Sequence, residues 1–416
     1  MTQETENREK YILIAVDYGQ DYAPDKSLDE LAELLKTAGG EAVARVVQRL
    51  DSPIPGTYLG SGKIEELSAY IEGERAAGNR IDGVLSDDEL SPAQMANLEQ
   101  ILGGKVLDRT SLILDIFALH AHTREGKIQV EMAQLSYRSS RLAGSFGQAL
   151  SRQGGGIGTR GPGESKLETD RRAIRNRMAR LRREIREMEK SRETGRKMRL
   201  QNGIPVVAIV GYTNAGKSTL LNRLTDSDVL EEDQLFATLD PTTRSARLKD
   251  GQKVLFTDTV GFIHKLPHQL VEAFHSTLEE ASYADIILHV IDGSDPEWPM
   301  HRQVVYDTLD ELDINGRPVI TAFNKSDLLT DPLHGMDGRA ERTVSISAKN
   351  GQGLDQLMDA ISDVLREIRV LIDRTFSYQE GAKVNQIHRM GQVLSEDYSE
   401  DGIHIRAYVP RNLTNV

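Results

Sequence analysis

The stretch PVVAIVGYTNAGKSTLLNRLT, residues 205–225, has an apolar run, a glycine-rich loop and a second apolar run in close succession. Its first apolar run is typical of a buried strand, and LLNRLT has the apolar spacing of a helix. Between them, GYTNAGKST (211–219) has the pattern G-x-x-x-x-G-K-[ST] in the strand–loop–helix setting that it requires. Backbone N–H groups of such a loop surround phosphate oxygens, next to the positive end of the helix. The stretch therefore predicts a phosphate-binding loop in an α/β domain.

The loop supplies the first set of candidate ligands. We expect Lys217 to reach the β and γ phosphates and Ser218 to ligate Mg²⁺. A glycine turn that matches by chance is the alternative, and the flanking strand and helix argue against it. The predicted nucleotide contacts in the loop are Gly211, Tyr212, Thr213, Asn214, Ala215, Gly216, Lys217, Ser218 and Thr219.

DTVG (258–261) follows a predicted strand and is the second element of the site. Asp258 is placed to hold the outer shell of the Mg²⁺ ion, and the N–H of Gly261 is placed to meet the γ-phosphate. Thr259 and Val260, between them, are also predicted to contact the nucleotide. Alone, such a tetrapeptide is common and weak.

Two further motifs predict which base is bound. NKSD (324–327) ends another predicted strand, and Asp327 accepts from the N1–H and the exocyclic amine of guanine, a donor pair that adenine lacks. In SAK (347–349), the N–H of Ala348 is expected at guanine O6. The remaining candidates support the loop and cover the ring: Asn324, Lys325, Ser326, Ser347 and Lys349. Four motifs in this order predict a guanine-nucleotide site.

The combination resembles the translation-factor class of GTPases, and Thr238 in FATLDPTT matches their switch threonine. That resemblance implies that Thr238 completes Mg²⁺ coordination when a γ-phosphate is present. The predicted contacts of this segment are Phe236, Ala237, Thr238, Leu239 and Asp240, and the residues expected to act in catalysis are Lys217, Thr238 and Gly261. A loop threonine that caps a turn is the structural alternative.

Phe262 and Asn214 bear on how fast hydrolysis runs. Many switch GTPases place a glutamine after DTVG to orient the attacking water, but here the position is Phe262, which cannot hydrogen-bond water. Slow intrinsic hydrolysis, raised by a partner, is the functional interpretation, and a packing residue is the alternative. Asn214 matches an asparagine of GTPases that bind a monovalent cation, so K⁺ and a plain phosphate-loop role both stay open.

Length and composition bound the rest of the chain. The 416 residues predict two to four domains, and 38% apolar with 28% charged residues fits a protein able to bury sizeable cores. With no cysteine, disulfides and thiolate metal sites are excluded. The charged start MTQETENREK has no signal-peptide core, and no apolar run approaches the roughly 20 residues of a membrane span. We expect a cytoplasmic protein.

Apolar periodicity divides the chain into four predicted segments. Residues 1–110 alternate strands and helices and predict a small parallel α/β subdomain. Residues 111–203 show heptad-like spacing on both sides of a glycine-rich tip, 147–165, which predicts an antiparallel helical hairpin. Residues 204–368 form the predicted P-loop G domain, a mostly parallel sheet with flanking helices, and 369–416 a small α+β C-terminal domain.

Charge is concentrated on the hairpin. The chain carries a net charge of −13, yet residues 138–199 hold 18 Lys and Arg against 7 Asp and Glu. A basic segment in an acidic protein indicates a localised surface for a polyanion, and a solvated helix face is the alternative.

At full length the chain resembles the HflX family of ribosome-associated bacterial GTPases, through YLGSGKIEEL (58–67), QVEMAQLSYRSSRL (129–142), GGGIGTRGPGESKLETDRR (154–172) and FATLDPTTR (236–244). The resemblance implies a monomer that binds GTP, GDP and the large ribosomal subunit, is partly ribosome-associated, and splits or rescues stalled ribosomes under stress. A thin, positive, glycine-rich tip suits folded rRNA. The expected rRNA contacts are Arg152, Arg160, Arg171, Arg172 and Arg175.

Other functions stay open at this point. A signalling switch whose basic hairpin binds acidic proteins or lipid is one, and an ATP-driven RNA remodeller is another, which NKSD argues against. GSGK (60–63) lacks the glycine spacing of a phosphate loop, so a strand-to-helix turn is favoured over a second nucleotide site.

Overall fold

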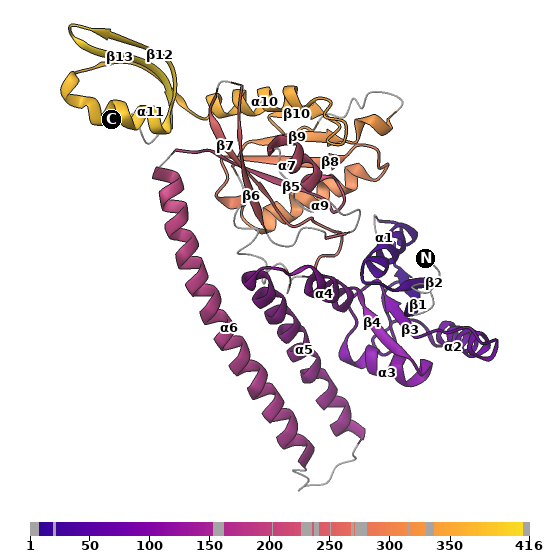
Figure 1. The fold of residues 1–416 in the computed structure, drawn as a ribbon. Helices are drawn as coiled ribbons and strands as arrows, with labels where there is room; N and C mark the ends of the chain where they lie inside the picture. Colours follow the sequence, from indigo (N-terminus) through magenta and orange to yellow (C-terminus); the bar gives the residue numbers. More distant parts are fainter. Residues whose placement is uncertain are drawn as a thin grey trace. The chain divides into compact units, whose positions relative to one another are not determined.

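The computed structural model describes residues 8–19, 22–152, 162–201, 203–225, 235–236, 241–249, 251–267, 270, 281–314, 316–329 and 337–410 (Figure 1). The chain divides into two compact units. One comprises Met1–Ile185, Gln234–Phe236 and His264–Phe274, and the other comprises Arg186–Asp233, Ala237–Ile263 and His275–Val416. In the part of the chain described, no helix has the length and apolar character to cross a membrane.

The first unit is built on a parallel four-stranded sheet in the order β2-β1-β3-β4. Its strands are β1 (Lys10–Asp17), β2 (Glu41–Arg49), β3 (Gly83–Ser86) and β4 (Lys105–Asp108), and its helices are α1 (Pro24–Thr37), α2 (Ser61–Ala76), α3 (Pro92–Leu102) and α4 (Arg109–His120). The run of β1 from Tyr11 to Val16 is buried throughout, as expected of a central parallel strand covered on both faces. Ile12 and Ile14 pack with side chains of α2 and α3, and α1 contacts β1 and β2.

Helix α4 starts directly after β4 because Asp108 caps it. The Asp108 carboxylate accepts from the backbone N–H of Ser111, and the Ser111 hydroxyl pairs with the Asp108 backbone, which makes a reciprocal capping box. The strand therefore leads into the helix with no loop between them, so the capping box holds the carboxyl end of β4 and the first turn of α4 together.

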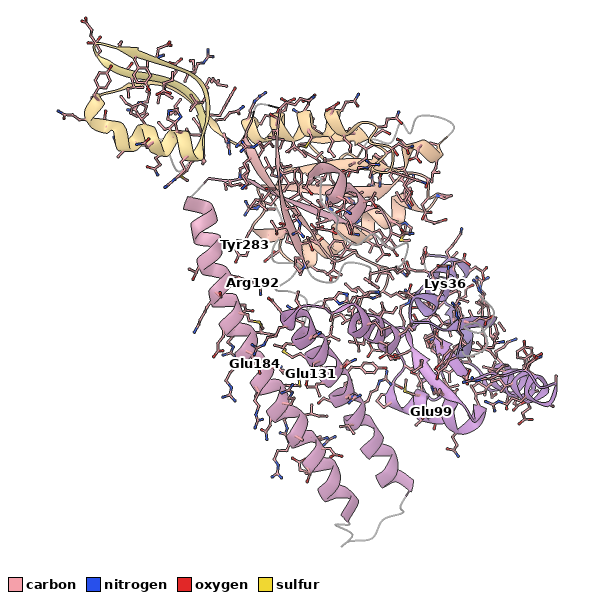
Figure 2. All side chains as sticks on the ribbon, in the orientation of Figure 1. Lys36, Glu99, Glu131, Glu184, Arg192 and Tyr283 are labelled. Atoms are coloured by element: carbon pink, nitrogen blue, oxygen red, sulfur yellow. The ribbon has the colours of Figure 1, made fainter. Side chains whose placement is uncertain are left out.

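Helices α5 (Arg124–Arg152) and α6 (Pro162–Gln201) form the predicted antiparallel hairpin. Glu131 of α5 pairs with Arg177 of α6, whereas Arg124, earlier on α5, pairs with Glu184, later on α6. Figure 2 labels the acidic partner of each pair, Glu131 on α5 and Glu184 on α6. Partners that run in opposite directions define an antiparallel pair. The α6 seam is as expected, with Leu181 fully buried.

Helix α5 has a second buried face that its heptad spacing does not predict. Val130, Ala133 and Tyr137 are buried, and α5 contacts both α3 and α4. This face packs α5 against α3 and α4, whereas Met132 and Leu135, which follow the heptad-like spacing that predicts the hairpin seam, are only half-buried.

The second unit contains a six-stranded sheet in the order β10-β9-β8-β5-β7-β6, parallel except for β6, which runs antiparallel to β7. Its strands are β5 (Val206–Gly211), β6 (Thr242–Arg247), β7 (Lys253–Asp258), β8 (Ile286–Asp292), β9 (Val319–Asn324) and β10 (Arg342–Ser345). Helices α7 (Lys217–Thr225), α9 (Trp298–Glu311) and α10 (Leu354–Glu367), with the short 3₁₀ turn η2 (Ser326–Leu328), complete it. Parallel strands end at one edge, so the motifs after β5, β7 and β9 gather there.

The C-terminal residues add an antiparallel sheet in the order β11-β13-β12. It consists of β11 (Val370–Phe376), the 3₁₀ turn η3 (Tyr378–Glu380), α11 (Gly381–Met390), β12 (Gln392–Ser399) and β13 (Gly402–Val409). Ile387 of α11 packs on Ile405 and Ala407, which gives this segment a small core of its own. It is the α+β appendage expected from the sequence, with β12 as an additional strand.

Candidate guanine-nucleotide site

Two residues of the loop 211–216 have backbone conformations that few residue types adopt. Asn214 and Gly216 have φ of +58° and +90°. A Cβ on Gly216 would lie 2.3 Å from Nδ2 of Asn324, so the NKSD motif reaches under the loop and only glycine fits between them. The side-chain amide of Asn324 donates to the Ala215 carbonyl at 2.8 Å. The phosphate-loop and base motifs are thus joined directly.

Lys217, the first residue of α7, is buried beneath the loop. Its ammonium group donates to the Tyr212 carbonyl at 2.8 Å. Burial lowers the pKa of Lys217 to about 8, while the Asp258 carboxylate acts in the opposite direction. A cation held under a cradle of backbone N–H groups is suited to phosphate oxygens.

An oxygen pair next to Lys217 has the chemistry that Mg²⁺ prefers. The Ser218 hydroxyl donates to Oδ2 of Asp258 at 2.7 Å, which brings two hard oxygen ligands together at the start of α7. A Cβ on Gly261 would lie 2.9 Å from both the Lys217 ammonium nitrogen and Cγ2 of Thr213. A side chain at position 261 would therefore clash with Lys217 and Thr213, so the close approach of this backbone requires glycine. The residues present fit a magnesium-bound triphosphate.

Phe262 is a buried packing residue whose backbone is fastened to the loop. Its carbonyl accepts from the Thr213 N–H at 2.8 Å, and its own N–H donates to the Gly211 carbonyl. The ring is 1% exposed. The position that often carries a water-orienting glutamine therefore holds a side chain that is removed from solvent and cannot hydrogen-bond.

The base motifs are held by hydrogen bonds among themselves. Oδ1 of Asp327 accepts from the Ser347 hydroxyl at 2.6 Å, and Oδ1 of Asn324 accepts from the Ala348 N–H at 2.9 Å. That N–H was expected at guanine O6, so a bond to the base would have to share this hydrogen. Lys325, with φ of +61°, pairs with Asp292 at 2.7 Å.

Two contacts of this site were not anticipated from the sequence. Asp292 ends β8 beside the end of β9, and its pairing with Lys325 follows from that adjacency. The ring of Tyr212 stacks on His301 of α9 with centroids 3.9 Å apart. The carboxyl-terminal position of Asp292 on a central strand was a usable signal, whereas nothing local marks His301.

The remaining predicted site residues lie in several different surroundings. Thr259 donates its hydroxyl to the Ile209 carbonyl, and the Lys349 carbonyl accepts from Arg223. Phe236 packs edge-on against Phe117 of α4, with centroids 4.6 Å apart. Ala237, Thr238, Leu239 and Asp240 lie outside the described residues, as does Arg160, and so does the side chain of Arg152.

The three predicted rRNA contacts on α6 differ in their surroundings. Arg171 is half-buried and donates to the Leu142 carbonyl, which makes it a clamp between the two hairpin helices. Arg175 pairs with Glu168 at the surface, and Arg172 is exposed. Only Arg172 and Arg175 therefore present their charge outward.

Comparison with known proteins adds independent information. Family models described as GTP-binding GTPase N-terminal, GTP-binding GTPase middle region and 50S ribosome-binding GTPase match residues 25–118, 120–199 and 206–325. The GTPase HflX of Lacrimispora saccharolytica is 55% identical, covering 98% of this chain and 95% of that protein. The GTPase HflX of Escherichia coli is 41% identical, covering 92% and 89%. A GTP-binding protein of Sulfolobus solfataricus, solved with GDP, is 23% identical with a TM-score of 0.44, covering 86% and 98%.

Proposed function

This chain belongs to the HflX family of GTPases, and we propose that it binds the large ribosomal subunit and uses GTP to split, rescue or recycle stalled ribosomes. GTP hydrolysis is the activity of the family. The description of the family model that matches 206–325, a 50S ribosome-binding GTPase, supports the choice of partner.

The observation that carries the ribosomal part of the proposal is the basic outer face of α6. Arg172, Arg175, Arg183 and Arg186 are exposed, and their spacing returns them to one side of the helix. Ile174, Leu181 and Ile185 fall on the opposite side, where Leu181 is fully buried. Because the apolar residues are used in the hairpin, the free face is basic and not amphipathic. Such a face suits RNA phosphate better than a lipid surface.

At the nucleotide site each residue has a proposed task. Lys217 and the loop N–H groups bind the β and γ phosphates, Gly261 senses the γ-phosphate, and Asp327 selects guanine. Ser218, Thr238 and, in the outer shell, Asp258 would hold Mg²⁺, which neutralises charge on the phosphates when it is bound. Because Phe262 cannot orient water, we propose a low basal rate that rises when the large subunit completes the site. A monovalent cation at Asn214 stays a prediction.

The hairpin tip provides the sharpest test. Arg152→Ala with Arg160→Ala should weaken binding to purified large subunits and leave GTP affinity unchanged. Losing two phosphate contacts should flatten the slope of log affinity against log salt by roughly 1 to 2. A matched control is Arg45→Ala with Arg80→Ala, which removes the same charge from two exposed arginines that pair with Asp29 and Asp82. Equal affinity and salt dependence in the tip variant, the control and the parent chain would refute the assignment of the tip.

A further inference from the structure

Helix α4 contacts both the hairpin and the two segments that adjoin the nucleotide motifs. The hairpin side is centred on Asp108, the residue that caps α4. The Asp108 side chain is fully buried and accepts from the Tyr137 hydroxyl at 2.7 Å. Arg141, one turn further along α5, forms an ion pair with the same carboxylate, and its guanidinium covers the Tyr137 ring. Two side chains of α5 thus hold the start of α4.

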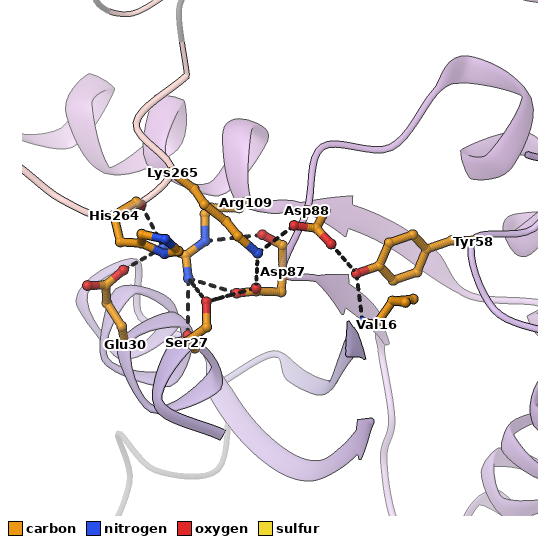
Figure 3. A network of polar contacts seen from close by, with 9 residues as sticks. All are labelled: Val16, Ser27, Glu30, Tyr58, Asp87, Asp88, Arg109, His264 and Lys265. Atoms are coloured by element: carbon orange, nitrogen blue, oxygen red, sulfur yellow. Dashed lines mark hydrogen bonds and ion pairs between the residues drawn. The ribbon is translucent and has the colours of Figure 1, made fainter. Parts of the chain in front are cut away.

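The next residue, Arg109, contacts a different set of groups. Its guanidinium is buried and pairs with Asp87 at 2.7 Å and with Glu30 at 2.6 Å (Figure 3). It also donates to the His264 carbonyl at 3.1 Å. A residue four positions from the end of DTVG in the chain, Lys265, bonds to Asp87 at 2.6 Å and also to Asp88. Asp87 therefore receives Arg109 from α4 and Lys265 from the segment after the phosphate-sensing motif.

The charges of this network persist at neutral pH. Burial would raise the pKa of Asp87, but Arg109 and Lys265 outweigh it and lower the pKa to about 2. Removal of one charge would leave its partner buried and uncompensated. Asp88 is fixed in turn by the hydroxyl of Tyr58, which accepts from the N–H of Val16 (Figure 3). Lys265 is held by a network that is itself anchored to the sheet.

A second contact joins α4 to the segment before Thr238. Phe117, two turns beyond Arg109, packs edge-on against Phe236, and both rings are buried. One helix therefore contacts the segments that flank both nucleotide-sensing motifs, while its capping residue is held by the hairpin.

We propose that Asp108 and Arg109 are a coupler between the hairpin and the nucleotide site. When the hairpin binds its partner and α5 is displaced, these two residues alter the position of residues 262–267 and so set the partner-dependent rate of hydrolysis. This inference rests on the proposed binding of the hairpin to the large subunit. Asp108 and Arg109 are adjacent in a capped helix start, so displacement of one displaces the other. Tyr137, Arg141 and Lys265 are its positioning residues, because they act on the nucleotide motifs only through the chain that they hold.

Tyr137→Phe with Arg141→Met tests the coupler, because it removes both links from α5 and keeps side-chain bulk. Basal hydrolysis and large-subunit affinity should match the parent chain, and stimulation by the subunit should fall at least about fivefold, the lower end of typical allosteric coupling. Lys127→Met is the control, since it removes an exposed charge from the same helix. Full stimulation in the double variant would overturn the coupler.

Lys265→Met should lower stimulation similarly, and combining it with the α5 changes should add little, because residues in series are not additive. Hydrogen exchange on the isolated chain separates this proposal from the ribosomal one. The α5 variant should exchange faster at 262–267 than Lys127→Met, with sheet protection unchanged. If the parent chain fails to bind large subunits but the α5 variant shows this faster exchange, the proposed function fails and the physical link from α5 to residues 262–267 stands. Unchanged exchange at 262–267 overturns the coupler.

Discussion

Replacing Asp327 with asparagine should convert the base preference of this site from guanine to xanthine. In the structure, the Ser347 hydroxyl donates to Asp327 and accepts from the Asn350 N–H. An amide at 327 would keep that bond through its oxygen and turn its NH₂ group to the base. In GTP this group faces the exocyclic amine, donor against donor. In xanthosine triphosphate it faces the C2 carbonyl, which accepts.

The size of the effect follows from the bonds exchanged. A bond to a carboxylate contributes about 1.5–3 kcal/mol, and a buried donor left unsatisfied costs about 1–3 kcal/mol. Their sum corresponds to a GTP affinity lower by roughly 10²- to 10⁴-fold. Titration of the variant with fluorescent GTP and xanthosine analogues measures both affinities, with the parent chain as reference. GTP affinity within threefold of the parent, or no gain for the xanthosine analogue, would refute the guanine assignment.

Three further predictions concern single residues. Lys217→Ala should abolish measurable GTP binding and keep the circular dichroism spectrum, since it removes a buried ammonium group whose lowered pKa shows that burial disfavours its charge. Gly261→Ala should lower GTP affinity, because its methyl would lie 2.9 Å from the Lys217 ammonium; an affinity equal to that of the parent chain would contradict the close approach. Burial, then Arg109 and Lys265, lower the pKa of His264 to about 4, against Asp87 and Asp88. The neutral ring therefore stabilises the fold above pH 6.5, and this contribution is lost as pH falls towards 4. Over that pH range the free energy of unfolding measured in urea should fall more in the parent chain than in His264→Gln. Parallel pH profiles for the two proteins would contradict this role of His264.

The nucleotide motifs could be located from the sequence because each depends on residues a few positions apart. Strand, glycine turn and helix follow one another in 205–225, and parallel strands bring their ends to one edge regardless of detail. The C-terminal helix and two of its strands were found for the same reason, since IHIRAYVP alternates clearly.

Three strands were missed because their apolar pattern is weak. β6, TTRSAR, and β10, RTVS, are polar edge strands, and β12, QVLSEDYS, is mostly exposed. An edge strand needs only one neighbour and buries little, so pairing decides its structure and composition does not.

The coupler could not be read from the sequence at all. Asp87 and Lys265 lie 178 positions apart, and each alone resembles an ordinary surface charge. The heptad-like spacing predicts one buried face of α5, so the second face, at Val130, Ala133 and Tyr137, was missed. Burial of charged groups is decided by tertiary packing, which periodicity does not encode.

We propose that GTP governs binding of this chain to the large ribosomal subunit. Co-sedimentation with purified large subunits, with a non-hydrolysable GTP analogue, with GDP and without nucleotide, tests it directly. We expect strong pelleting with the analogue, much less with GDP, and loss of the difference in Lys217→Ala. Equal pelleting in all three conditions, or none in any, would contradict it.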